Sequence, residues 1–153
     1  MATVSNITLI EQAERHVLSV RQTIHFDDFS AVAGVAYQTI GKYAKDGGIL
    51  FSGCPFVCYH NADLEHLDVE LGFPVATPIK GQGVITGYTI PIQKAVSGIF
   101  LGPYTETDPL MMDIFAWIAQ NGYEPRGEIY HYYLNDETRP ATELLTQIVV
   151  TIK

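Results

Sequence analysis

The sequence predicts an α+β fold in which a strand-helix-strand-strand half occurs twice, at about residues 7–76 and 83–153. The chain has 153 residues, 47% of them hydrophobic and 17% charged, which suits one domain with a substantial core. Strand-like and helix-like apolar spacings follow one another in the same order in both halves. We therefore expect the halves to join into one antiparallel sheet, with both helices on one face and a central ligand groove where the halves meet.

The first half opens with β-branched residues that predict a strand centred near residues 15–24. Apolar residues at helical spacing predict a helix over Phe29–Ala44. Asp27-Asp28 offers an N-cap just before this helix, and Gly47-Gly48 supplies a stop just after it. Two further strands are expected, at Pro55–Asn61 and Leu67–Val75.

The second half repeats this order. Residues 83–101 are strand-like, and Thr107-Asp108-Pro109 predicts a helix start because proline is favoured in the first helical turn. Helical spacing continues to a stop at Asn121-Gly122. Two strands are then expected, at Gly127–Leu134 and Glu143–Ile152.

The two halves also share local sequence. Tyr59-His60-Asn61 ends the third element of the first half, and Tyr133-Leu134-Asn135 ends the third element of the second half. When a loop three residues longer is allowed in the second half, this alignment places Glu70 opposite Gln147.

Charge and hydropathy limit the partners that we expect. The chain has a net charge of −8 and no basic cluster, so its surface should repel phosphate, and we expect no direct binding to nucleic acid. The longest apolar runs are too short to span a bilayer, so we expect no membrane association. The N-terminus has no basic segment followed by an apolar one, which indicates a cytoplasmic protein without a signal peptide.

No cofactor or metal site is expected from the motifs. The sequence has no glycine-rich nucleotide loop, no zinc-protease helix motif and no serine in a nucleophile context. Its five histidines are scattered, and the spacing of Cys54 and Cys58 matches no common zinc pattern. We interpret Cys58 as a small buried hydrophobic residue.

The candidate ligand-binding residues are polar or aromatic side chains on the predicted strands. Asp68 and Glu70 share one strand face, where Glu70 would offer a carboxylate to a cationic ligand; alternatively, both point into water. Nine tyrosines suit a site for flat, positively charged compounds, although tyrosine is also common as an ordinary sheet residue. Gln147 would hydrogen-bond in the groove. His131 and Glu143 have ordinary alternatives, as a structural hydrogen-bonding residue and as a solvated strand start.

Three stretches resemble the GyrI-like family of effector-binding domains. Residues 68–75, Asp-Val-Glu-Leu-Gly-Phe-Pro-Val, resemble its D-x-E-x-G-x-P-V strand. Gly102-Pro103-Tyr104, followed by Trp117 and Gly122-Tyr123, resembles its signature around the second helix. Tyr133-Leu134-Asn135-Asp136, followed by Thr146-Gln147-Ile148, resembles its closing strands.

The resemblance implies the duplicated fold and a role in small-molecule binding. Such domains are the effector-binding parts of bacterial AraC- and MerR-class multidrug regulators and also occur alone, as we expect for residues 1–153. Members bind hydrophobic or cationic compounds, commonly against an acidic residue and aromatic side chains. Two positions depart from the family pattern, because Gln147 stands where the family often has Glu and His131 stands where it often has an acidic residue. Glu70, and then Glu143, are therefore the expected counter-charges.

Three hypotheses remain open at this point. The first is a non-catalytic domain that binds hydrophobic, cationic organic compounds. The second is a hydrolase of small electrophilic compounds that uses Glu70 or Glu143. The third is a protein-interaction module of the gyrase-modulator type, which would act on a topoisomerase or a regulatory protein. A homo-oligomer is a separate open alternative. The predicted ligand-binding residues are Glu70, Tyr59, Tyr104, Trp117, His131, Tyr133, Glu143 and Gln147.

Overall fold

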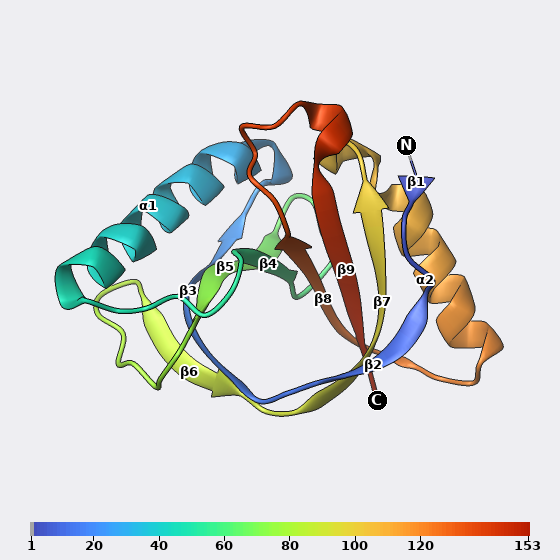
Figure 1. Cartoon of the computed structure of the whole chain (residues 1–153), viewed down its shortest axis with the longest axis horizontal. Coiled ribbons are helices and arrows are strands. Elements are labelled where there is room, and N and C mark those ends of the chain that lie inside the picture. The colour runs from blue at the N-terminus through green and yellow to red at the C-terminus, as the bar shows by residue number, and fades with distance from the viewer. Residues whose placement is uncertain (1) are drawn as a thin grey trace. The chain divides into compact units, whose positions relative to one another are not determined.

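The computed structural model describes residues 2–153, which fall into two units. The N-terminal unit is Ala13–Pro91, and the C-terminal unit combines the residues up to Gln12 with Ile92–Lys153. Each unit is an antiparallel sheet with one long helix (Figure 1). The predicted α+β class and its duplicated strand-helix-strand-strand order are therefore confirmed.

The N-terminal unit places its strands in the order β4-β5-β3-β6, with every neighbouring pair antiparallel. Its helix lies against the two central strands of this unit, β3 and β5. The elements are β3 (Arg15–Ile24), a 3-10 turn η1 (Phe26–Asp28), α1 (Phe29–Gly47), β4 (Phe56–Tyr59), β5 (Leu67–Val75) and β6 (Thr86–Ile90).

The C-terminal unit has the matching order β8-β9-β7, and two short N-terminal strands pair with the other edge of β7. Its helix lies against β7 and β9. The elements are β1 (Ala2–Thr3), β2 (Thr8–Gln12), β7 (Gln93–Leu101), η2 (Tyr104–Glu106), α2 (Asp108–Gln120), β8 (Pro125–Tyr133), η3 (Ala141–Glu143) and β9 (Leu145–Ile152).

One predicted strand is two strands in the structure. The sequence pattern predicted a continuous strand over residues 83–101, but β6 ends at Ile90 and β7 begins at Gln93. Pro91 stands between them, where it has no N–H to donate to a strand ladder. The two strands belong to different units, because β6 pairs with β3 and β7 pairs with β9.

Strand pairing confirms the alignment of the two halves. Ser19 is paired with Gly72, and Glu70 lies two residues earlier on β5. In the C-terminal unit Ser97 is paired with Val149, and Gln147 lies two residues earlier on β9. Glu70 and Gln147 therefore occupy equivalent positions.

The asparagine that follows the third element plays the same part in both units. Asn61 donates to the His66 carbonyl and accepts from the Asp68 N–H, at 3.0 Å each. Asn135 donates to the Glu143 carbonyl at 2.7 Å and accepts from the Leu145 N–H at 2.9 Å. The longer loop of the second half is thus closed by the same pair of hydrogen bonds.

Each helix covers one face of its sheet. In α2, Leu110, Ile114 and Ile118 are buried against apolar side chains of β7 and β9, among them Val96 and Ile148. Side chains alternate along a strand, so the neighbours Ser97 and Gln147 lie on the other face. By the same register, Ser19 and Glu70 lie on the face of the N-terminal sheet that is turned away from α1. This alternation positions the candidate site.

No helix within residues 2–153 is long and apolar enough to cross a bilayer.

Candidate functional site

Glu70 is the centre of a buried polar cluster on β5. Its side chain is only 2% exposed, so the alternative in which it points into water is wrong. One carboxylate oxygen, Oε2, accepts hydrogen bonds from the Ser19 hydroxyl at 2.6 Å and from the Tyr88 hydroxyl. The other, Oε1, lies 2.9 Å from Nε2 of His60. Four segments of the N-terminal unit therefore converge on one carboxylate.

The close approach of these strands depends on the glycine at position 72. A Cβ atom there would lie 2.4 Å from the Leu18 carbonyl oxygen, 2.9 Å from Cβ of Ser19 and 3.0 Å from Cζ of Phe56. Gly72 thus lets β3 and the Phe56 ring close around the strand that carries Glu70.

The cluster keeps Glu70 ionised. Burial by itself would raise the pKa of this carboxyl group, but the hydrogen bonds of His60, Ser19 and Tyr88 outweigh burial and hold the pKa below its ordinary value. Burial, followed by the hydrogen bond to Glu70, raises the pKa of the Tyr88 hydroxyl. Tyr88 is therefore a neutral donor to a negatively charged acceptor.

A second acidic residue on the same strand face is already paired. The Arg21 guanidinium donates two hydrogen bonds to Asp68, Nε to Oδ1 at 2.9 Å and a terminal nitrogen to Oδ2 at 2.8 Å. These bonds hold the pKa of Asp68 below its ordinary value. Arg21, which lies opposite Glu70 in the strand register, thus forms its hydrogen bonds with Asp68.

Cys58 adds a sulfur atom to the carboxylate oxygen of Glu70 and the imidazole nitrogen of His60, and all three types of atom can ligate a metal. Cys58 is the strand partner of Glu70 and is completely buried. Its Sγ atom, Nε2 of His60 and a carboxylate oxygen of Glu70 all lie within 4.8 Å of one another. Sequence spacing predicts no metal site here, because Glu70 lies ten residues from His60 and reaches Cys58 only through strand pairing.

The C-terminal unit carries a neutral version of the Glu70 arrangement. Nε2 of Gln147 donates to the Ser97 hydroxyl at 2.9 Å, at the positions equivalent to Glu70 and Ser19. Gln147 stands where the family often has Glu. The C-terminal unit therefore has no carboxylate at the position equivalent to Glu70.

Several of the predicted aromatic residues lie on the helix side of their sheets. Tyr59 is paired with Val69, so it lies on the opposite face from Glu70, and its ring stacks on Phe29 of α1 with centroids 6.1 Å apart. The rings of Tyr104 and Tyr133 meet with centroids 4.9 Å apart. Trp117 belongs to α2, and its ring stacks on Tyr123 at 6.2 Å.

The last two predicted residues have different surroundings. His131 is buried on the helix side of β8, and burial lowers its pKa to about 4, so it is neutral near pH 7. Glu143 is exposed in η3, where its carboxylate lies 3.7 Å from the Arg139 guanidinium. Neither environment resembles that of Glu70.

Sequence reasoning missed three of the side chains that surround Glu70. The sequence pattern predicts Tyr88 only as a strand residue, and His60 is one of five scattered histidines. The available signal was Ser19, a polar residue within the apolar run Val17–Val20. Because a buried hydroxyl needs a hydrogen-bond partner, Ser19 predicts a polar group opposite it.

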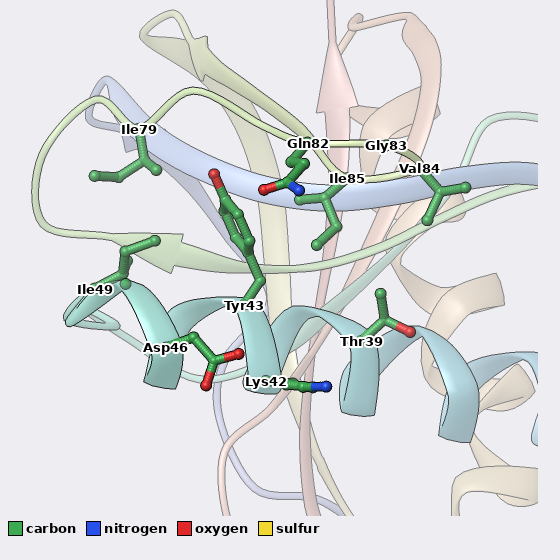
Figure 2. A pocket seen from close by; sticks show the side chains of 11 residues that line it. Thr39, Lys42, Tyr43, Asp46, Ile49, Ile79, Gln82, Gly83, Val84 and Ile85 are labelled. Atoms are coloured by element: carbon green, nitrogen blue, oxygen red, sulfur yellow. The ribbon is translucent and has the colours of Figure 1, made fainter.

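A separate open cavity of about 820 Å³ lies between the second half of α1 and residues 79–85 (Figure 2). Figure 2 shows Tyr43 rising from α1 toward the loop, and its hydroxyl donates to the Lys80 carbonyl at 2.7 Å. Neither Glu70 nor its partners line this cavity.

Residues 5–153 match the family of the GyrI-like small molecule binding domain. The chain belongs to the GyrI-like family. The resemblance seen in the sequence is therefore confirmed, and small-molecule binding is the role of this family. No curated protein matches the chain significantly.

Three solved structures show the GyrI-like fold. The C-terminal domain of EcmrR has a TM-score of 0.85 and 23% identity, with 98% of each chain covered. A hydrolase from Listeria innocua has a TM-score of 0.70 and 12% identity, with 99% of this chain and 94% of that chain covered. SAV2435 bound to tetraphenylphosphonium has a TM-score of 0.58 and 13% identity, with 97% of this chain and 94% of that chain covered.

The predicted partners, which excluded nucleic acid, need correction. EcmrR was also solved in a complex with DNA, and that chain matches with a TM-score of 0.84 and 23% identity over 97% of this chain. The expected absence of a nucleic-acid partner is therefore contradicted by EcmrR, which contains this fold. This chain spans 57% of the EcmrR chain, so the net charge of one domain does not constrain the contacts of the remainder.

Proposed function

We propose that this GyrI-like domain binds a small, lipophilic organic cation, with the carboxylate of Glu70 as the counter-charge. The observation that carries the proposal is a buried carboxylate whose pKa lies below the ordinary value. A buried negative charge is costly unless its partners compensate for lost water, and here three polar side chains do so.

The neighbours of Glu70 suit a cation with aromatic groups. Ser19 and Tyr88 are neutral donors, so they keep the carboxylate charged without cancelling its charge. Tyr88 is 39% exposed although Glu70 is buried, so this tyrosine is the accessible side of the cluster. An aromatic face beside a carboxylate attracts cations both through its quadrupole and through the adjacent charge. The binding of tetraphenylphosphonium by SAV2435 supports this class of ligand.

The hydrolase hypothesis is less well supported at Glu70. A general base works best when its pKa lies near the working pH, whereas the pKa of Glu70 is lowered. The likeness to the Listeria hydrolase is at 12% identity and concerns the fold.

The test compares a cation with a neutral compound of similar shape. We expect calorimetric titration to show that the wild-type chain binds tetraphenylphosphonium more tightly than triphenylphosphine oxide. Glu70→Gln keeps the size of the side chain but removes its charge. It should weaken cation binding by about 10–100-fold, since a hydrogen bond or contact to a charged group contributes about 1.5–3 kcal/mol. It should leave the neutral compound nearly unaffected.

The matched control is Glu65→Gln, which removes the same charge from an exposed position of the same unit. This variant should bind the cation as the wild type does. Equal losses for the cation and the neutral compound in Glu70→Gln, or an unchanged cation affinity, would remove Glu70 from this role.

A further inference from the structure

We propose that Cys58, His60 and Glu70 form a binding site for a transition-metal ion of the zinc class. Their sulfur, nitrogen and oxygen ligand atoms lie within 4.8 Å of one another. Cys58 lies directly opposite Glu70 in the pairing of β4 with β5. His60 follows two residues later, and its N–H donates to the Asp68 carbonyl at 2.9 Å, which continues the pairing beyond β4. Two adjacent strands thus present all three side chains on one face.

The distances suit a tetrahedral ion after small side-chain movements. Bonds of about 2.3 Å to sulfur and about 2.0–2.2 Å to nitrogen and oxygen place neighbouring ligand atoms roughly 3.3–3.8 Å apart. Nε2 of His60 and Oε1 of Glu70 are 2.9 Å apart and would separate slightly. The remaining pairs, within 4.8 Å, would close by about 1.5 Å at most.

The choice of ligands selects the metal. A cysteine thiolate and an imidazole favour Zn²⁺ and related ions over Mg²⁺ and Ca²⁺, which prefer oxygen ligands. Three protein ligands leave one tetrahedral position for water or another molecule. This site also differs from a chance group of surface acids, because Cys58 is fully buried and Glu70 nearly so.

The surroundings of Glu70 provide orientation and access. Ser19 and Tyr88 both bond to Oε2, which directs Oε1 toward His60 and thus toward the ion. Such outer hydrogen bonds hold metal-binding carboxylates in place. The side chain of His60 is 16% exposed, so it is the most accessible of the three ligands.

A metal ion on Glu70 would neutralise the carboxylate proposed to attract an organic cation. The inference shares Glu70 with the proposed function but does not depend on it, because metal binding also requires the Cys58 thiol, which the cation proposal does not use. If both proposals hold, Zn²⁺ should compete with tetraphenylphosphonium.

The experiment uses the full chain, stripped of metal with a chelator, and Co²⁺ as a spectroscopic substitute for Zn²⁺. We expect one equivalent of Co²⁺ to produce a thiolate-to-cobalt charge-transfer band, and Zn²⁺ to displace it. Cys58→Ser should abolish the band and weaken Zn²⁺ binding by more than about 100-fold, which exceeds the usual loss from an outer-shell change. His60→Gln should weaken metal binding as well.

Two matched variants serve as controls. Cys54→Ser removes the other cysteine, and His66→Gln removes an exposed histidine of the same loop region. Both should bind Co²⁺ with the wild-type spectrum. Circular dichroism and thermal unfolding show whether each variant is folded, and His60→Gln keeps the test valid if Cys58→Ser does not fold.

The outcomes separate the two proposals. The cobalt and zinc titrations are read without any organic cation, so failure of the tetraphenylphosphonium test leaves the metal test intact. The metal proposal is overturned if the wild type binds no stoichiometric Co²⁺ or Zn²⁺, or if the cobalt–thiolate band survives in Cys58→Ser.

Discussion

Two buried titratable residues show how the same direction of pKa shift has opposite consequences for stability. Hydrogen bonds lower the pKa of Glu70, so its ionisation stabilises the folded state above the ordinary pKa of 4.5. This stabilisation is lost as the pH falls through the folded pKa. Burial lowers the pKa of His131 to about 4, so the folded state disfavours the imidazolium. As the pH falls below about 6.5, the unfolded chain takes up this proton first and stability decreases.

We expect His131→Phe to flatten the pH dependence of stability between about pH 6.5 and about pH 4. The histidine should contribute a slope of about 1.4 kcal/mol per pH unit, and about 3 kcal/mol over the interval. Urea unfolding of the two proteins at several pH values measures this difference. An identical slope in both proteins would mean that His131 is protonated in the folded state.

At the scale of elements, the pairing of β3 with β5 brings Ser19 and Glu70 together. The chain keeps these strands close by having no side chain at Gly72, where a Cβ would meet the Leu18 backbone. Within α1, by contrast, a Cβ at Gly34 or Gly41 would meet nothing within 4 Å. Glycine is therefore required in the strand but not in the helix.

Gly72→Ala should lower the free energy of unfolding by about 1–3 kcal/mol, because β3 or Phe56 must move to accept the methyl group. Gly34→Ala is the matched substitution, and it should raise stability by about 0.5–1 kcal/mol, since alanine is the better helix residue. Chemical unfolding of both variants tests this pair of opposite signs. A stability loss in Gly34→Ala as large as that in Gly72→Ala would contradict the strand-specific explanation.

At the scale of the whole molecule, the two halves repeat one plan but differ in charge. In the N-terminal unit Ser19 bonds to the carboxylate of Glu70. At the equivalent positions of the C-terminal unit, Ser97 bonds to the neutral amide of Gln147. The net charge of −8 gives the surface a negative field in addition. Cation binding could therefore come from the buried Glu70 or from the diffuse surface field, and salt distinguishes these sources because surface charges are screened far more than buried ones.

We expect the affinity for tetraphenylphosphonium to change less than about threefold when NaCl is raised from about 0.1 M to about 1 M, although the Debye length falls from about 10 Å to about 3 Å. Calorimetric titration at both salt concentrations gives the measurement. If high salt weakens binding as strongly as Glu70→Gln does, the surface field rather than the buried carboxylate holds the ligand.

The sequence by itself determined the α+β class, the duplicated order of elements, the family and the equivalence of Glu70 with Gln147. These depend on local periodicity, caps and short motifs, which a linear pattern records. Only the tertiary structure decided that Ser19, His60, Tyr88 and Cys58 meet at Glu70, and that Tyr59 lies on the opposite face. Strand register decides such contacts, and a shift of one residue would turn every side chain of a strand to the other face.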